Sequence, residues 1–412
     1  MKEERLMLYP LKFKPYLKFY PYGGRRFVEV LEMEHVPRDR DVAESWEVSD
    51  HGEEQSTVVN GPLAGRTLRE LMQEFKAELA GDEIYSVYGD YFPLLLKFLD
   101  CDKRLPAHMH PNDYHAARLG LKDKGKTEAW YIVRADPGAA GYCGSLPDLT
   151  PEKFRAAIER GDTYDGVMKK TPTTTGETYF VPAGRLHGLD AGNLAFEIQQ
   201  NSDAGFGWDW AGFVEAGVIS AEDAKRHPEL AIECAYYEDG PQEQTKYVTV
   251  QQDGVERTFC CACHYFVLER WRAHEPFTFY DEAARFNTLT VTNGAAIFAG
   301  NGEEVFARRG ESLLIPAGVR VEIRPQALPN AGEVEMLRCY VPNLQRDVIE
   351  PLRRHGVRDV DIAWLGSYGQ GNDLLPLLGL PQDALNVKPE DRQAAEERAE
   401  ASRAETARLS ES

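Results

Sequence analysis

The sequence lacks the segments that would carry a chain into or across a membrane. No run approaches the roughly 18 apolar residues of a transmembrane helix. The start, MKEERLMLYPLKFKPYLKFY, contains no apolar core of signal-peptide length. The seven cysteines are an odd number scattered over 412 residues. We therefore expect free thiols, a cytoplasmic location and no membrane partner.

Positive charge is also scarce, and the usual nucleotide-binding loops are missing. Lys and Arg total 47 against 67 Asp and Glu, which gives a formal net charge of −20. An acidic surface repels phosphates, so we expect no nucleic acid partner, and any phosphorylated ligand needs a locally basic pocket. The sequence contains no glycine-rich loop of the Walker or Rossmann type and no Gly-x-Ser-x-Gly elbow.

An internal repeat is the most informative feature that is present. Residues 176–187 read GETYFVPAGRLH, and residues 310–321 read GESLLIPAGVRV. In both, a short β run ends at Pro-Ala-Gly, where proline stops the strand and glycine permits a tight turn. The final position is His187 in the first copy and Val321 in the second. The template resembles a signature motif of the cupin β-barrel, which predicts two such barrels.

The fold class expected is mainly β, with two cupin (double-stranded β-helix, jelly-roll) barrels, a small helical insertion and a helical C-terminal extension. A helix is predicted at 67–80 from its apolar spacing, with Thr67 as its cap, and the insertion carries a second helix at 150–161 that opens with Thr-Pro-Glu. The expected division is a metal-binding domain at 1–240 with the insertion at about 148–171, a second barrel without metal ligands at 247–345, and a helical extension with a charged tail at 346–412.

Four residues of the first barrel have the chemistry of a metal site. His108 and His110 are two positions apart, so on a strand both imidazoles project from one face. Glu128 can add an oxygen from a neighbouring strand, and His187 supplies a third imidazole after the Pro-Ala-Gly turn. This ligand set suits one divalent ion, with Zn, Mn, Fe, Co and Ni all open. A surface His-x-His pair is the alternative interpretation of His108 and His110.

A second group of metal-binding residue types is interpreted as structural. Cys260, Cys261, Cys263 and His264 lie within FCCACHYFVLERW, a β-like run in which adjacent side chains point to opposite faces. No second cysteine pair is placed to complete a zinc site. The remaining histidines are expected at the surface or in satisfied positions.

Several segments carry a family resemblance and occur in family order over roughly residues 8–345. They include ESWEVS (44–49), NGPLAGRTLRELM (60–72), FPLLLKFLDCDKRLPAHMHPNDYHA (92–116), GKTEAWYIVRADPGA (125–139), GETYFVPAGRLHGL (176–189) and EIQQNSD (197–203). Taken together, these segments resemble the type I mannose-6-phosphate isomerases, zinc-dependent cupin enzymes of cytoplasmic sugar metabolism.

The resemblance implies that His110, Glu128 and His187 bind zinc, that Lys126 lies at the substrate, and that Lys97 lies near the same cavity. Two departures stand out. The family usually has Gln where this chain has His108. An Arg that follows Asn-Ser-Asp in the family, and belongs to its active site, is absent here.

Two further residues enter as candidates for the substrate chemistry. Arg185, beside the ligand position, is a candidate substrate contact that would compensate for the missing Arg. Asp209, retained in the segment after Asn-Ser-Asp, is with Lys126 a candidate for moving the substrate proton. Burial beside a metal is expected to lower the pKa of Lys126.

The leading functional prediction is a metal-dependent aldose–ketose isomerase. It would convert mannose 6-phosphate to fructose 6-phosphate, or act on a related hexose, by proton transfer through a metal-stabilised enediolate. A non-catalytic or regulatory sugar-binding cupin and a cupin metalloenzyme of other chemistry remain as alternatives. The expected partner is a small sugar or sugar phosphate, and the sequence leaves the oligomeric state open.

Overall fold

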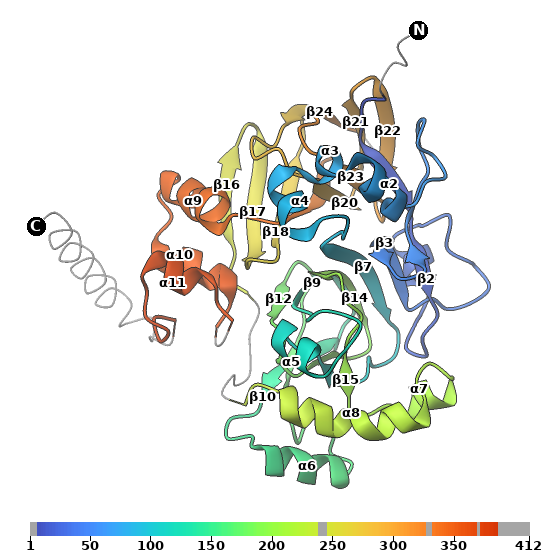
Figure 1. Cartoon of the computed structure of the whole chain (residues 1–412), viewed down its shortest axis with the longest axis vertical. Coiled ribbons are helices and arrows are strands. Elements are labelled where there is room, and N and C mark those ends of the chain that lie inside the picture. The colour runs from blue at the N-terminus through green and yellow to red at the C-terminus, as the bar shows by residue number, and fades with distance from the viewer. Residues whose placement is uncertain (1–5, 238–244, 327–331, 369–370, 386–412) are drawn as a thin grey trace, which may run out of the picture.

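Two β-barrels, each made of a larger and a smaller antiparallel sheet, form the body of the protein in a computed structural model (Figure 1). The structure describes residues 6–237, 245–326, 332–368 and 371–385. None of the helices in these ranges is long and apolar enough to cross a membrane. The prediction of a mainly β fold with two barrels is confirmed.

The first barrel contains all four predicted metal ligands. Its larger sheet has the order β12 (Thr178–Val181), β9 (Glu128–Ala135), β14 (Asn193–Gln200), β7 (Leu94–Cys101), β3 (Glu44–Val48) and β2 (Tyr16–Lys18). Its smaller sheet has the order β11 (Met168–Pro172), β10 (Ala140–Ser145), β13 (His187–Leu189), β8 (His108–Met109) and β15 (Phe206–Gly207). A short hairpin, β4 (Asp50–His51) with β5 (Glu54–Gln55), follows β3.

The second barrel repeats this arrangement and recruits two strands from the start of the chain. Its larger sheet has the order β16 (Val248–Gln252), β17 (Val255–Ala262), β18 (Val267–Ala273), β25 (Val334–Tyr340), β20 (Asn287–Asn293), β23 (Ser312–Ile315), β1 (Leu11–Lys14) and β6 (Thr57–Val58). Its smaller sheet has the order β19 (Phe277–Phe279), β24 (Val321–Pro325), β21 (Ala295–Gly300) and β22 (Glu303–Arg308). The proposed domain division therefore needs one refinement, because β1 and β6 pair with the second barrel.

Strand β7 shows how one strand serves both barrels. All eight of its residues are buried, which explains its nearly continuous apolar sequence. Leu94 and Leu96 pack in the core shared with the second barrel, whereas Lys97 faces the polar interior of the first. The single lysine in PLLLKFL is thus an inward-facing residue of a strand that is covered on both faces.

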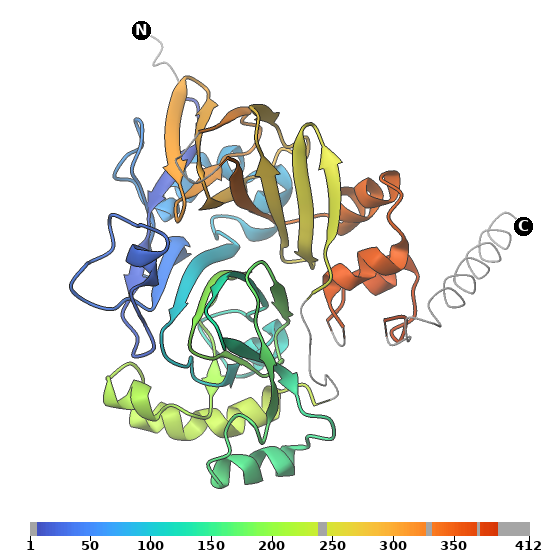
Figure 2. The same cartoon turned by 180° about the vertical axis from the view of Figure 1, so that it is seen from behind.

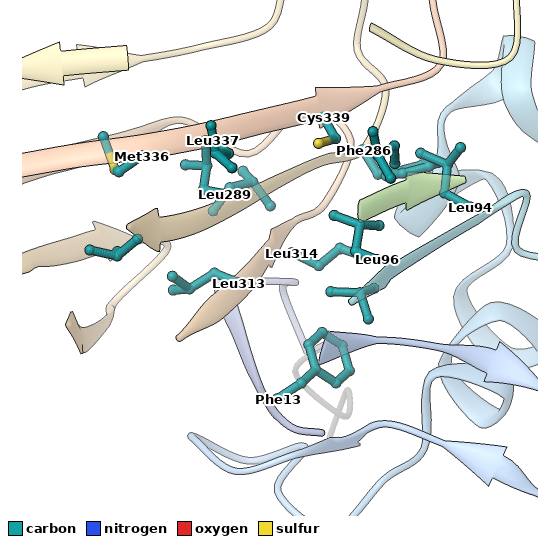
Figure 3. Close-up of a cluster of buried hydrophobic side chains, with 14 of the residues drawn as sticks. Phe13, Leu94, Leu96, Phe286, Leu289, Leu313, Leu314, Met336, Leu337 and Cys339 are labelled. Carbon is teal, nitrogen blue, oxygen red and sulfur yellow. The ribbon is translucent and has the colours of Figure 1, made fainter. Parts of the chain in front are cut away.

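The shared core lies where the larger sheets of the two barrels meet (Figure 3). Side chains from β1, β7, β20, β23 and β25 fill it. The labelled residues are Phe13, Leu94, Leu96, Phe286, Leu289, Leu313, Leu314, Met336, Leu337 and Cys339. Burying this much apolar surface between two sheets is the main force that fixes one barrel against the other.

Helices occupy the outside of the barrels. They are α1 (Arg26–Glu29), α2 (Leu68–Phe75), α3 (Ala77–Ala80), α4 (Asp82–Tyr88), α5 (Asp113–Arg118), α6 (Pro151–Glu159), α7 (Ala211–Glu215), α8 (Ala221–Cys234), the π-helix η1 (Gln345–Ile349), α9 (Glu350–Arg354), α10 (Asp359–Ala363), the 3₁₀-helix η2 (Trp364–Gly366) and α11 (Leu374–Leu378). Helices α6, α7 and α8 cover the end of the first barrel farthest from the second (Figure 1, Figure 2). Helices α9, α10 and α11 flank β16 and β17.

The caps of two helices are the ones that the sequence predicts. Thr67 caps α2 through a reciprocal capping box with Glu70. Thr150 caps α6, and Pro151 occupies the first helical turn. The helix predicted at 67–80 is divided in two, because Lys76 adopts a positive φ of 50° between α2 and α3. Most of the segment between the two predicted domains (241–246) and the end of the predicted charged tail, from residue 386, lie outside the described residues.

Candidate metal centre and active site

Three imidazoles converge inside the first barrel. His187 on β13 is the direct cross-strand partner of His108 on β8, and His110 follows two residues later. Nε2 of His187 lies 3.0 Å from Nε2 of His108 and 3.2 Å from Nε2 of His110. In the described part of the chain, these three residues form a group whose ligand atoms all lie within 4.8 Å of one another.

The second ring nitrogen of each histidine faces a backbone carbonyl oxygen. Nδ1 of His108 lies 2.7 Å from the oxygen of Pro106, and Nδ1 of His110 lies 2.8 Å from that of Ala204. Nδ1 of His187 lies 2.8 Å from the backbone oxygen of Arg185. A carbonyl only accepts, so each Nδ1 donates its proton and each Nε2 keeps a free lone pair. This is the tautomer that binds a metal through Nε2.

Burial holds these rings neutral. It lowers the pKa of His110 to about 3 and that of His187 to about 4, with the neighbouring Lys126 charge contributing to both shifts. Burial also lowers the pKa of His108, and the two other imidazoles add to that effect. Neutral rings that point their lone pairs at one another repel, and a cation between them removes this repulsion.

Glu128 completes the group at the start of β9. Its Oε2 lies 3.1 Å from Nε2 of His110, and its Oε1 lies 3.4 Å from Nε2 of His187. The carboxylate is fully buried, and its Oε1 has no hydrogen-bond donor. A buried carboxylate that faces the Nε2 lone pairs of His110 and His187 fits a divalent cation.

Two lysines extend the site across the barrel interior. Nζ of Lys126 lies 2.9 Å from Glu128 Oε2 and 3.4 Å from Glu197 Oε1. Nζ of Lys97 lies 3.3 Å from Glu197 Oε1 and 3.2 Å from Glu44 Oε2. Positive and negative groups therefore alternate along one buried row, which we call the charge row: Glu44, Lys97, Glu197, Lys126 and Glu128.

The charge row sets the protonation of its members. Burial and the nearby Glu128 charge raise the pKa of Glu197 to about 7, against the lowering effect of the two lysines. For Lys126, burial opposes the charged form, but Glu128 and Glu197 outweigh it and raise the pKa. Burial therefore produces no net lowering of the Lys126 pKa, because two carboxylates contact the ammonium group.

Two predicted residues are placed elsewhere. The guanidinium of Arg185 is buried and donates to the backbone oxygens of Phe180, at 2.6 Å, and Tyr368, at 2.9 Å. Asp209 is half-buried and accepts a hydrogen bond from Thr163 Oγ1 at 3.5 Å. These contacts give Arg185 a structural role in the turn and do not connect Asp209 with Lys126, so they support neither as a substrate or proton-handling residue.

The sequence analysis missed four functional candidates. Glu44 and Glu197 flank Lys97, while Trp46 donates its indole N–H to Glu44 Oε2 at 2.7 Å. Trp130 similarly donates to Glu197 Oε2 at 3.2 Å. All four lie in segments that carry the family resemblance. A charged residue inside a fully buried strand is the signal that could have identified the two glutamates.

Comparison with known proteins identifies the family of the chain. A family model for the phosphomannose isomerase type I catalytic domain matches residues 11–129. The chain is 32% identical over 263 residues to the mannose-6-phosphate isomerase ManA of Bacillus subtilis, covering 64% of this chain and 79% of ManA. The chain belongs to the type I mannose-6-phosphate isomerase family.

Further matches agree with this family and show how much of each relative's length the chain covers. GmuF of Bacillus subtilis, a probable mannose-6-phosphate isomerase, is 36% identical over 198 residues; the match spans 48% of this chain and only 60% of GmuF. The crystal structure of the Bacillus subtilis mannose 6-phosphate isomerase superimposes with a TM-score of 0.69 at 25% identity, covering 81% of this chain and all of that one. The predicted family and cupin fold are thus confirmed.

Proposed function

We propose that the protein is a metal-dependent aldose–ketose isomerase that interconverts mannose 6-phosphate and fructose 6-phosphate. The observation that carries the proposal is the convergence of three imidazole Nε2 atoms and Glu128 beside the buried ammonium group of Lys126. Family membership supplies the reaction class. The proposed metal ligands are His108, His110, Glu128 and His187, and zinc is the ion that best suits three nitrogens and one oxygen.

The reaction moves one proton between C2 and C1 of an open-chain sugar while the carbonyl moves the other way. A bound divalent ion supplies a Lewis acid that polarises the sugar oxygens. Lys126 places a buried cation beside Glu128, where it can donate hydrogen bonds to a substrate oxygen. Lys97 lies one carboxylate farther along the charge row and holds Glu197 in place from the other side.

Glu197 is the proposed proton-handling group of this row. Its Oε1 lies between the two ammonium groups, at 3.3 Å from Lys97 and 3.4 Å from Lys126, and accepts no hydrogen bond. A carboxyl with a pKa of about 7 exchanges a proton readily near neutral pH. This assignment replaces Asp209, whose hydrogen bond lies with Thr163.

The test combines metal content with a substrate panel. Purified protein is measured for bound metals, then assayed with mannose 6-phosphate, fructose 6-phosphate, mannose and fructose, with deuterium exchange at C2 as a second readout. We expect one divalent ion per chain and turnover of the phosphorylated hexoses.

Glu128→Gln tests the assignment of the site. We expect it to lose both tight metal binding and turnover, because an amide replaces the anionic ligand. Glu53→Gln is the matched control, since Glu53 is an exposed glutamate in the hairpin after β3. Metal binding without proton exchange on any hexose would favour a sugar-binding cupin, and full activity in Glu128→Gln would refute the site.

A further inference from the structure

The second barrel repeats the first strand for strand. The sheet order β12-β9-β14-β7-β3 of the first barrel has its counterpart in β23-β20-β25-β18-β17, and β11-β10-β13-β8 has its counterpart in β22-β21-β24-β19. Strand pairing therefore assigns, residue by residue, the place in the second barrel that corresponds to the metal site.

Cross-strand partners fix this correspondence on the smaller sheet. His187 pairs with His108 in the first barrel, and Val321, at the same position of the repeat, pairs with Phe279 in the second. On the larger sheet, Glu128 pairs with Val181, the residue before the first Pro-Ala-Gly turn. Asn287 pairs with Ile315, the residue before the second Pro-Ala-Gly turn. The positions of His108, His110, Glu128 and His187 therefore correspond to Phe279, Asp281, Asn287 and Val321.

A guanidinium group joins the corresponding side chains in the second barrel. Nε of Arg338 lies 2.8 Å from Asn287 Oδ1, and its Nη2 lies 2.9 Å from Asp281 Oδ2. Its Nη1 lies 3.3 Å from Oε1 of Glu269, the cross-strand partner of Arg338. In the first barrel, the equivalent cross-strand pair is Glu197 with Lys97. The second barrel thus keeps the buried ion pair with its charges exchanged.

Arg338 and Asp281 of this network form the floor of an open cavity of about 590 Å³. A cavity of this volume is in the usual range for a small-molecule site, about 300–1,000 Å³. Arg257 and Arg285 extend the floor, with Arg257 bound to Glu269 and Arg285 bound to Asp281. Aromatic side chains form the walls; they are Trp271, Phe277, Phe279, Tyr280 and Tyr340.

The charges around the cavity balance. Five arginines and five carboxylates line it, and the floor guanidiniums already contact carboxylates. The arginines are Arg257, Arg285, Arg338, Arg346 and Arg354, and the carboxylates are Asp253, Asp281, Glu282, Asp347 and Glu350. A phosphate or carboxylate ligand would find no excess positive charge there. Fixed donors and acceptors beside aromatic faces suit a neutral ligand with many hydroxyl groups.

We propose that this cavity is a second ligand site, and that it binds a neutral monosaccharide or disaccharide without a metal. Aromatic walls would contact the C–H faces of the sugar, while Arg338 and Asp281 would hold its hydroxyl groups. The proposal is independent of the isomerase reaction, because the cavity belongs to the second barrel and shares none of its lining residues with the charge row.

The C-terminal segment gains a role from this site. Arg346 and Asp347 in η1 and Glu350 and Arg354 in α9 line one side of the cavity. Asp347 is anchored to Arg285, and Arg346 binds Glu83 of α4 with Nη1–Oε1 at 2.7 Å. The start of the extension is therefore a wall of the second site.

Sugar binding to the full chain tests the proposal in a Glu128→Gln background, which isolates the second barrel from the metal site. Saturation-transfer NMR titrations use mannose, glucose, a mannose disaccharide and mannose 6-phosphate. Tyr280→Ala removes an aromatic wall, and Tyr247→Ala is the matched control, because these tyrosines are 40% and 42% exposed and Tyr247 lies outside the cavity. Glu282→Trp, at an exposed lining position, obstructs the cavity.

We expect the neutral sugars to bind the Glu128→Gln protein, and Tyr280→Ala to weaken that binding roughly fivefold or more, as for loss of an aromatic contact. Glu282→Trp should weaken it similarly, and Tyr247→Ala should leave it unchanged. Introduced singly into the otherwise native chain, Tyr280→Ala and Glu282→Trp should retain isomerase activity, which shows that both fold. Three results would overturn the proposal: no neutral sugar binds, mannose 6-phosphate binds instead, or Tyr280→Ala and Tyr247→Ala behave alike.

Discussion

Glu47 is a carboxyl group buried at a bulge in β3, and we expect it to make the stability of the folded chain depend on pH. The pairing of β3 with β7 shifts register between Trp46 and Val48, so Glu47 is the extra residue. Its side chain is 1% exposed and accepts a hydrogen bond from Ser45 Oγ at 2.6 Å. Burial raises its pKa to about 8, against the lowering effects of hydrogen bonds from Ser45 and Ser312.

The stability effect follows from the pKa difference between folded and unfolded chains. The folded carboxyl binds its proton more tightly than the unfolded one, whose pKa is 4.5. Stability from this group is therefore fully present below pH 4.5 and is lost as pH rises towards about 8. At about 1.4 kcal/mol for each pKa unit, Glu47 reduces the free energy of unfolding by about 3 kcal/mol at pH 7.

Glu47→Gln removes this proton linkage while keeping the side-chain shape. We expect the variant to exceed the parent protein in stability by about 1 kcal/mol at pH 5 and about 3 kcal/mol at pH 7. Urea unfolding at several pH values from 5 to 8.5 measures the difference, and Glu53→Gln is the control because Glu53 is exposed. A difference that stays constant across this range, or shrinks as pH rises, would refute the reasoning.

Three further changes test the site and its scaffold. His108→Gln, which installs the usual family residue, should retain metal and activity but change the metal preference, as metal-exchange titrations would show; complete loss of metal would contradict this. Lys97→Met should destabilise the chain by about 3–5 kcal/mol, because Glu44 and Glu197 lose a buried partner; adding Glu197→Gln should recover part of that loss in urea unfolding, and additive losses would disprove the coupling. Thr67→Ala should cost about 0.5–2 kcal/mol through loss of the α2 cap, and an unchanged melting temperature would count against it.

Local patterns predicted much of the fold and the core of the site. The Pro-Ala-Gly repeat identified two barrels and placed His187 at a ligand position, because the template depends only on strand ending and turn chemistry. The spacing of His108 and His110 placed both rings on one face of a strand. Thr67 and Thr150 were identifiable as helix caps for the same reason, since capping involves residues within one turn.

Other site residues could not be predicted, because strand order is not a local property. The charge row draws on four strands or their flanks that are neighbours only in the order β9-β14-β7-β3. Conversely, a residue close in sequence to the site can point away from it. Arg185 is two residues before His187, yet its guanidinium binds the carbonyl oxygens of Phe180 and Tyr368. Sequence proximity determines where a side chain starts, not where its charged end lies.

The sequence by itself therefore predicted the family through its ordered motifs, the two-barrel class through its turn repeat, and the convergence of His108 and His110 through strand periodicity. The tertiary structure alone decided that β1 joins the second barrel through pairing with β23, and that carboxylates hold the two lysines charged. It also decided that Arg338 contacts the counterparts of two proposed metal ligands. These features depend on which distant strands pair, and that choice follows from burying the shared core as a whole.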